Sequence, residues 1–191
     1  MYRAVLDTCV LVPGLQRHFL LQLATEEAFA PLWSSGTVGE LDDVFARIDS
    51  TRHRADSEGY RARLLAEMRL AFPGAEIRAP RDGAYDYDID DPGDGHVAHA
   101  AILGKADAIV TDDRRSGLAT SAILRAAAID VVHPSDFAAN TVAAHPEAGV
   151  RTLYAMAERM TQPEQTPHEI LRQLRARYGM VDVADMLLPR L

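Results

Sequence analysis

Acidic residues stand at the ends of two apolar segments of the sequence. The segment YRAVLD, residues 2–7, ends in Asp7, and the segment AIVTDD, residues 108–113, ends in Asp112 and Asp113. If both segments are strands of one parallel sheet, their carboxyl ends lie at the same edge, where such sheets bind ligands. Carboxylates that lie close together raise each other's pKa, whereas Mg²⁺ or Mn²⁺ prefers oxygen ligands. The pattern therefore predicts a site for a hard divalent cation.

Two further acids, Glu40 and Asp94, are candidates for the same site, although each also has a structural interpretation. Glu40 follows Thr37 at the spacing of a helix capping box. Asp94 precedes Gly95, where a helix is expected to begin, and can cap that helix. Asp7 alone is as compatible with a helix cap or a turn as with a functional role. Only the combination of these acids favours a chemical role.

Other reactive side chains lie near these acids in the sequence. His96 and His99 have the i, i+3 spacing of a helical pair, which suggests zinc or iron, but neither a cysteine partner nor an HExxH motif accompanies them. We therefore interpret both as ordinary helix histidines. Cys9 is the only cysteine, which excludes an intramolecular disulfide and favours a reducing compartment. Because no paired histidine is evident, we expect Cys9 to be buried near the first strand and not to be a nucleophile.

Short apolar segments alternate with segments of helical periodicity along most of the chain. The expected strands are residues 2–7, 29–33, 75–80, 106–111 and 129–133. Helices are expected after Pro13-Gly14, from about Thr37, and over residues 55–72, 96–106 and 117–128. This alternation is typical of parallel strands joined by right-handed helical crossovers, with helices on both faces of the sheet. The predicted fold class is therefore α/β, a doubly wound parallel sheet flanked by helices.

The last part of the chain has a different pattern. Helices alone are expected there, over residues 146–161, 167–178 and 181–188. Thr166, Pro167 and Glu169 form a strong helix start, and Gly179 marks the end of that helix. This part carries as many acids as arginines, whereas the whole chain has a net charge of −8. We therefore predict a domain of residues 1–143 and an all-helical C-terminal extension of residues 144–191.

The net charge of −8 argues against a protein that holds nucleic acid by broad charge attraction. Much of the excess acid lies in residues 81–95, which are expected to form a solvated loop. No apolar stretch approaches the roughly 20 residues that span a bilayer. The first apolar run contains Asp7 and lies too near Met1 for a signal peptide. We therefore expect a soluble, cytoplasmic protein without a membrane partner.

Three segments together resemble a known family: VLDTCVLVPG at 5–14, LWSSGTVGELDDVF at 32–45 and DPGDGHVAHAAILGKADAIVTDD at 91–113. They are similar to the PIN-domain nucleases, in particular to the branch that includes VapC toxins of toxin–antitoxin pairs, over roughly residues 2–140. The resemblance implies a PIN-like fold. It places the catalytic, metal-binding acids of the family on Asp7, Glu40, Asp94 and Asp113.

Two positions depart from the pattern of this family. The family commonly has Asn or Ser two positions after its first acid, where this chain has Cys9. Asp112 directly precedes Asp113, so the register of the fourth acid is open by one residue. Because side chains alternate along a strand, the two point in opposite directions, and we favour Asp113.

The resemblance further implies a metal-dependent endoribonuclease that uses Mg²⁺ or Mn²⁺, acts as a VapC-type toxin on RNA, pairs with a cognate antitoxin and forms a homodimer. Substrate contacts are expected from Thr8, Arg114 and Arg115, since arginine binds phosphate through paired hydrogen bonds. Residues 47–69 offer further phosphate contacts: Arg47, Arg52, Arg54, Arg61, Arg63 and Arg69. The alternative is a catalytically weak PIN-like module that only binds RNA or protein; the presence of four acids argues against it.

Overall fold

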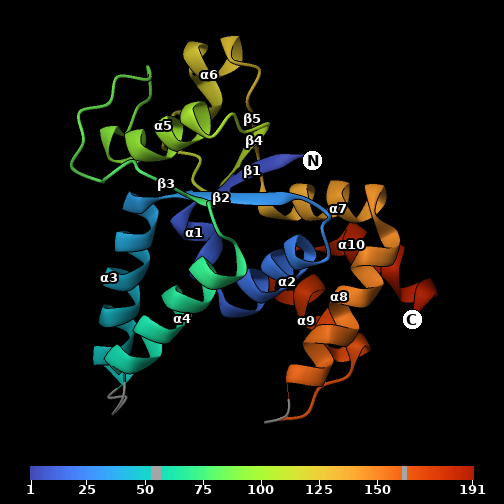
Figure 1. The fold of residues 1–191 in the computed structure, drawn as a ribbon. Helices are drawn as coiled ribbons and strands as arrows, with labels where there is room; N and C mark the ends of the chain where they lie inside the picture. Colours follow the sequence, from blue (N-terminus) through green and yellow to red (C-terminus); the bar gives the residue numbers. More distant parts are fainter. Residues whose placement is uncertain (53–56, 161–162) are drawn as a thin grey trace. The chain divides into compact units, whose positions relative to one another are not determined.

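The fold is organised around a five-stranded parallel sheet with the strand order β3-β2-β1-β4-β5 (Figure 1). The computed structural model describes residues 1–52, 57–160 and 163–191. The strands are β1 (Arg3–Leu6), β2 (Ala30–Ser34), β3 (Glu76–Ile77), β4 (Ala108–Val110) and β5 (Asp130–Val132). The predicted α/β class, a parallel sheet flanked by helices, is confirmed.

The two strands that precede the acids are neighbours and are buried on both faces. Val5, Leu6, Ile109 and Val110 are all fully buried. β1 pairs with β4 in parallel, with Val5 opposite Ile109. A strand covered on both faces needs continuous apolar sequence, which explains the two apolar runs. The pairing continues to the N–H of Asp7, which donates to the carbonyl of Val110 (3.1 Å).

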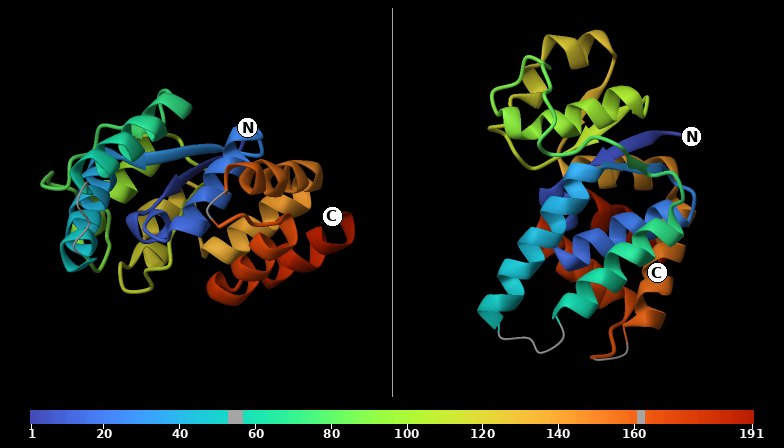
Figure 2. Two further views of the ribbon diagram at one scale, coloured as in Figure 1. Left: turned by 90° about the horizontal axis from the view of Figure 1, so that it is seen from below. Right: turned by 60° about the vertical axis from the view of Figure 1, so that its left-hand side comes forward.

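Helices lie on both sides of this sheet. α5 (Gly95–Leu103) packs against β1 and β4, and α6 (Ala122–Ala126) lies on the same side (Figure 1). The other side carries α1 (Thr8–Leu11), α3 (Ser35–Arg52) and α4 (Ser57–Ala71). α3 and α4 pack side by side, as the right-hand view of Figure 2 shows. α3 begins at Ser35, directly after the carboxyl end of β2.

Contacts within the chain divide it into two units, each discontinuous in sequence. The sheet unit contains Arg3–Val12 and Pro31–Val131. The helical unit contains Met1–Tyr2, Pro13–Ala30 and Val132–Leu191. α2 (Gly14–Thr25) therefore belongs with the C-terminal helices, although it is inserted early in the sequence. The predicted boundary between residues 143 and 144 stays a prediction.

The helical unit consists of α2 and the helices after the sheet: α7 (Pro134–Ala144), α8 (Pro146–Arg159), α9 (Pro167–Tyr178), α10 (Val181–Leu187) and the short 3₁₀ turn Leu188–Arg190. α8 packs against α2, α7 and α9, and α10 packs against α7 and α9. Leu153, Leu174 and Leu187 are fully buried between these helices. Within the part of the chain that the structure describes, no helix has the length and apolar character needed to cross a membrane.

The limits of α9 follow from local sequence signals. Thr166 accepts a hydrogen bond from the N–H of Glu169, and the Glu169 carboxylate accepts one from the N–H of Thr166 (2.8 Å). Gly179 ends the helix in the left-handed region with φ 65°, which suits a residue without a Cβ. Both predictions for this helix are confirmed.

Some sequence predictions need correction. Thr37 and Glu40 do not form a capping box, because α3 begins at Ser35 and the N–H of Thr37 donates to Ser34 Oγ (2.7 Å). The expected strand at 75–80 is reduced to β3. The helices α1 and α7 were not predicted. Residues 55, 56 and 161, at the ends of two predicted helices, lie outside the described residues.

Candidate active site

Asp7 lies at the carboxyl end of β1 and is only 4% exposed. Its Oδ1 atom accepts a hydrogen bond from the N–H of Thr8 (2.6 Å), which makes Asp7 the N-cap of α1. Its Oδ2 atom accepts from the hydroxyl of Thr111 (2.7 Å) and the thiol of Cys9 (3.3 Å). Burial raises the pKa of Asp7, and the charge of Glu40 adds to the increase, whereas the three hydrogen bonds oppose it. The carboxylate is thus held in one orientation at a site where its charge needs a counter-ion.

The residues after β4 reach the same edge of the sheet. Besides donating to Asp7, the hydroxyl of Thr111 accepts a hydrogen bond from the N–H of Asp113 (3.0 Å). The Asp113 carboxylate accepts one from the N–H of Arg115 (2.7 Å). Asp112 is held differently, because its N–H donates to the sulfur of Cys9 (3.3 Å). The two acidic segments therefore meet, as parallel pairing of their strands requires.

The thiol of Cys9 contributes to this arrangement without the properties of a nucleophile. Burial raises the pKa of Cys9 to about 12, and the charge of Asp7 adds to the effect. The thiol therefore stays protonated at neutral pH and donates to Asp7. Cys9 stands where the resembled family commonly has Asn or Ser, and its half-buried thiol supplies a donor at that position.

Glu40 reaches the site from α3, and its carboxylate makes long-range contacts instead of the capping-box contact that was its alternative interpretation. Its Oε2 atom accepts from the hydroxyl of Thr8 (2.7 Å), and Oε1 lies 3.3 Å from Nε2 of His96 and 3.2 Å from Nε of Arg81. Partial burial raises the pKa of Glu40, but hydrogen bonds from His96 and Thr8, with the attraction of His96 and Arg81, outweigh burial and lower it. The hydroxyl of Thr8 thus orients the Glu40 carboxylate. The predicted contact of Thr8 with substrate stays a prediction.

Asp94 stands at the start of α5, but its side chain makes no capping hydrogen bond. Its Oδ2 atom is buried and has no hydrogen-bond partner among the described residues. Burial, followed by the charges of Asp7, Asp91, Asp113 and Glu40, raises the pKa of Asp94 to about 7. The acids therefore share one electrostatic field, in which an unpaired buried carboxylate oxygen is unfavourable without a cation.

The donor set fits a hard divalent cation. All four predicted acids supply oxygen, and three of them raise the pKa of the fourth, Asp94. Within residues 1–52, 57–160 and 163–191, no group of three or more His, Cys, Asp or Glu side chains stands close enough to hold a metal ion. Mg²⁺ keeps several waters and often binds proteins through one or two carboxylates, so the unpaired Asp94 oxygen is compatible with it. Asp113 is among the charges that raise the pKa of Asp94.

Comparison with family models identifies both parts of the chain. A PIN domain model matches residues 3–115, more than half of the chain and a range that contains all four acids. The chain belongs to the PIN domain family. A model of the VapC50 C-terminal domain matches residues 134–189, from the start of α7. The two matches support a VapC-like nuclease toxin with a C-terminal extension. No match was found among curated proteins or among solved structures.

The two histidines of the PIN domain have separate partners. His96 is fully buried, with Nδ1 2.7 Å from Ser34 Oγ and Nε2 facing Glu40. His99 Nδ1 lies 2.6 Å from the hydroxyl of Tyr87. The pair therefore does not form a shared set of metal ligands. The contact between His96 and Glu40 was not predicted, because the two residues are 56 positions apart and no local pattern joins them.

The predicted phosphate contacts of the PIN domain differ in their surroundings. Arg114 and Arg115 are both exposed and directly follow the acidic end of β4. Arg61 is instead paired with a carboxylate of α3 (2.8 Å) and is 14% exposed, so its guanidinium is already engaged. Arg54 and the side chain of Arg52 lie outside the described part of the chain. Arg114 and Arg115 stay the arginines predicted to contact substrate.

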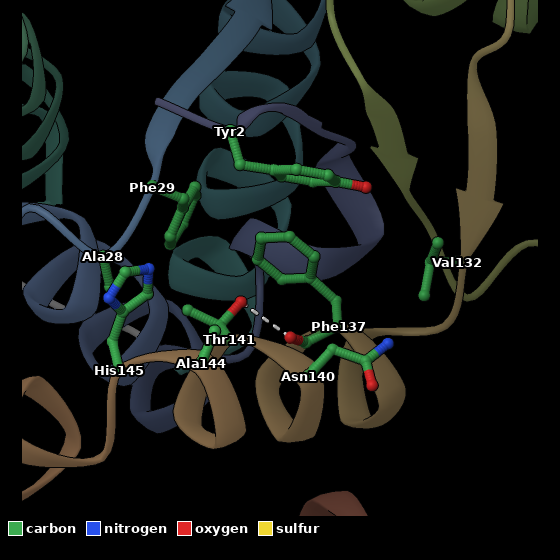
Figure 3. Close-up of a pocket in the computed structure, with 9 residues that line it drawn as sticks. All are labelled: Tyr2, Ala28, Phe29, Val132, Phe137, Asn140, Thr141, Ala144 and His145. Atoms are coloured by element: carbon green, nitrogen blue, oxygen red, sulfur yellow. Dashed lines mark hydrogen bonds between the residues drawn. The ribbon is translucent and has the colours of Figure 1, made fainter.

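A pocket of about 260 Å³ belongs to the helical unit and not to the PIN site (Figure 3). Its walls include the aromatic rings of Tyr2, Phe29 and Phe137, and its polar groups include Asn140 and His145. The rings of Phe29 and Phe137 pack edge to face with centroids 4.8 Å apart. Neither the candidate acids nor the predicted phosphate-binding arginines are among the residues that line this pocket.

Proposed function

We propose that this protein is a metal-dependent endoribonuclease, the toxin of a VapBC-type toxin–antitoxin pair. The observation that supports this most directly is the buried Oδ2 atom of Asp94, which finds no hydrogen-bond partner in the described part of the chain. Burial and the charges of Asp7, Asp113 and Glu40 hold the pKa of Asp94 near 7, so the group gains from a cation beside it. Because the donors are oxygens, the proposed cofactor is Mg²⁺ or Mn²⁺.

The proposed ligands, taken from the family resemblance, are Asp7, Glu40, Asp94 and Asp113, of which a Mg²⁺ ion that keeps its waters needs direct contact with only one or two. A metal held there would lower the pKa of a water nucleophile and neutralise charge on the phosphoryl oxygens during displacement. The chain itself supplies orientation: Thr111 and Cys9 fix the Asp7 carboxylate, and Thr8 fixes that of Glu40. Two of the four carboxylates are thus held in place before any ligand arrives, which reduces the cost of ordering the site.

RNA is the proposed substrate, in keeping with a VapC-like toxin. Arg114 and Arg115 directly follow Asp113, and exposed guanidinium groups at this position can bind the phosphates that flank the scissile bond. A bound cation would offset part of the acidic charge that repels RNA. The resemblance implies products with 5′-phosphate and 3′-hydroxyl ends.

A cognate antitoxin and a second copy of the chain are the proposed partners, and the cytoplasm is the proposed compartment. A small gene for a DNA-binding protein directly upstream would support the pairing. Light scattering after size-exclusion chromatography measures the oligomeric state, and a mass of 20.9 kDa, that of one chain, would contradict the homodimer.

RNA cleavage by purified variants tests the proposal. Asp7→Asn and Asp94→Asn should abolish cleavage in Mg²⁺ or Mn²⁺ while circular dichroism shows a retained fold. Asp112→Asn is the matched control, because Asp112 is exposed and is not one of the proposed metal ligands. Full activity of both site variants would contradict the assignment. RNA binding without cleavage by the wild-type protein would favour the alternative, a binding-only PIN-like module.

A further inference from the structure

Two buried polar side chains, Ser34 and His96, connect in series to the carboxylate of Glu40. Ser34 at the end of β2 and His96 on α5 are both fully buried. Nδ1 of His96 lies 2.7 Å from Ser34 Oγ, and Nε2 lies 3.3 Å from Glu40 Oε1. We propose that His96 is a positioning residue that holds Glu40 in its metal-binding orientation, an inference that rests on the proposed metal-dependent function.

The direction of these hydrogen bonds follows from the groups involved. A carboxylate oxygen only accepts, so Nε2 of His96 carries the hydrogen and donates to Glu40. The other ring nitrogen lies 2.7 Å from Ser34 Oγ, which accepts a hydrogen bond from the N–H of Thr37 (2.7 Å) and donates one to the Thr37 hydroxyl (2.9 Å) in the first turn of α3. Ser34 is thus anchored by the same helix that carries Glu40. The chain of contacts fixes both the tilt of the ring and the carboxylate that it faces.

Steric contact further restricts the ring of His96. A Cβ on Gly36 would lie 2.7 Å from Cγ of His96, so the ring packs directly against the backbone of α3. The N–H of Gly36 is itself bonded to the carbonyl of Ala79 (2.9 Å), which keeps that backbone in place. The backbone of α3 therefore limits the movement of the ring on that side.

His96 differs from Arg81, the other nitrogen-bearing partner of the Glu40 carboxylate. Arg81 contacts the same oxygen at 3.2 Å, but its side chain is 62% exposed and also approaches Asp43 (3.8 Å). An exposed ion pair contributes little to orientation, because solvent screens it and the long side chain is mobile. The ring of His96 is fully buried with both nitrogens engaged, so it cannot touch RNA or take a metal itself. Its effect on the reaction must pass through Glu40.

Two substitutions of His96 separate positioning from core packing. In His96→Gln, the amide nitrogen can take the place of Nε2 and still donate to Glu40. In His96→Asn, the shorter amide takes the place of Nδ1, which keeps the contact with Ser34 and loses the one with Glu40. Both variants remove the ring, so a purely structural role would affect them alike. Ser34→Ala removes the anchor of the ring without altering His96.

The measurement is Mn²⁺ binding to the full-length protein, by calorimetry and by the paramagnetic resonance signal of free Mn²⁺. His96→Asn should raise the Kd for Mn²⁺ by about 10–100-fold, the range for loss of a partner that orients a metal ligand. His96→Gln should stay near the wild-type Kd, and Ser34→Ala should fall between the two. In RNA cleavage, His96→Asn should lower kcat more than it raises KM.

Three results would overturn the inference. Equal loss of Mn²⁺ binding in the Asn and Gln variants, with equal loss of Tm, would make His96 a core residue only. Wild-type affinity in His96→Asn would remove its link to Glu40. If neither His96 variant folds, an unchanged Mn²⁺ affinity of Ser34→Ala would have the same consequence. Failure of the proposed function is distinct, because the wild-type protein itself would then neither bind Mn²⁺ nor lose cleavage in Asp94→Asn.

Discussion

At the level of single residues, the carboxylates of Asp7 and Asp94 differ in their hydrogen bonding. Asp7 accepts hydrogen bonds from a backbone N–H, a hydroxyl and a thiol, whereas the buried oxygen of Asp94 has no partner among the described residues. The first carboxylate is oriented by the protein, and the second is left for a ligand. Leaving a buried polar atom unpaired destabilises the fold, which is a common property of functional sites. Stability and function therefore place opposite demands on Asp94.

The hydrogen bond from Cys9 to Asp7 predicts how substitution at this position affects cleavage. Cys9→Ser keeps a donor and should cleave RNA at a rate close to that of the wild type. Cys9→Ala removes the donor and should be about tenfold slower, in keeping with about 1.5 kcal/mol for a hydrogen bond to a charged group. Initial rates in Mn²⁺ measure the difference. Equal rates for Ser and Ala would show that the donor is dispensable.

The raised pKa of Asp94 predicts a pH-dependent gain in stability from Asp94→Asn in the metal-free protein. The folded pKa of about 7 exceeds the ordinary aspartate value of 3.8, so the folded chain binds more protons between these values, and stability falls as pH rises through them. In EDTA at pH 8, Asn should raise Tm by about 2–4 °C, which corresponds to about 1 kcal/mol for a chain of this size. At pH 4 the two proteins should melt alike. A gain of equal size at both pH values would show that the charge is not the cause.

At the level of elements, α3 does more than cover the sheet. It carries Glu40, packs against the ring of His96 through Gly36, and contacts α5, the helix that carries His96. The first two turns of α3 are thus part of the site. Its later turns pack against α4.

Two glycines of α3 provide a matched test of this contact. Gly36→Ala places a Cβ 2.7 Å from the His96 ring, and the strain should lower the free energy of unfolding by about 1–3 kcal/mol. Gly39→Ala meets nothing within 4 Å and should raise it by up to about 1 kcal/mol, because alanine favours the helix. Urea unfolding of both variants measures the two effects. A stabilising Gly36→Ala would contradict the close packing of the ring.

The sequence predicted those elements and contacts whose signals are local or follow from parallel pairing. The capping box at Thr166 and the two apolar strands are signals of this kind, and parallel pairing brought Asp7 and Asp113 to one edge. The single turn α1 is too short to show a helical period. Only the family resemblance placed Glu40 at the site, because the partners that hold its carboxylate are 32 and 56 positions away in the sequence. Long-range hydrogen bonds between polar side chains leave no periodic pattern, so this part of the site required the structure.

At the level of the whole molecule, the chain builds two units from interleaved segments. The helical unit takes α2 from between β1 and β2 and the remaining helices from the end of the chain. The VapC50 C-terminal domain match begins at residue 134, so it covers the second part of this unit and not α2. α2 packs mainly against α8, so the first segment of this unit depends on the second to cover its apolar residues.

Removal of residues 146–191 therefore predicts loss of solubility more than loss of metal binding. The apolar face of α2 that packs against α8 would be left uncovered. The milder variant Leu153→Ala, at a fully buried position, should cost about 2–5 kcal/mol and keep the wild-type Kd for Mn²⁺. Centrifugation of cell extracts measures the first effect, and urea unfolding with Mn²⁺ titration measures the second. A soluble, stable chain ending at residue 145 would show that the C-terminal helices are dispensable.

The early insertion of α2 also sets an order of events during synthesis. α2 ends at Thr25, whereas its partner α8 begins at Pro146. At a translation rate of about 5–20 residues per second, α2 waits on the order of ten seconds for its partner to emerge. The sheet unit ends at Val131, before α8 has been made. The strands and acids of the sheet unit are therefore synthesised before α8, and until α8 emerges the apolar residues of α2 lack the helix that covers them.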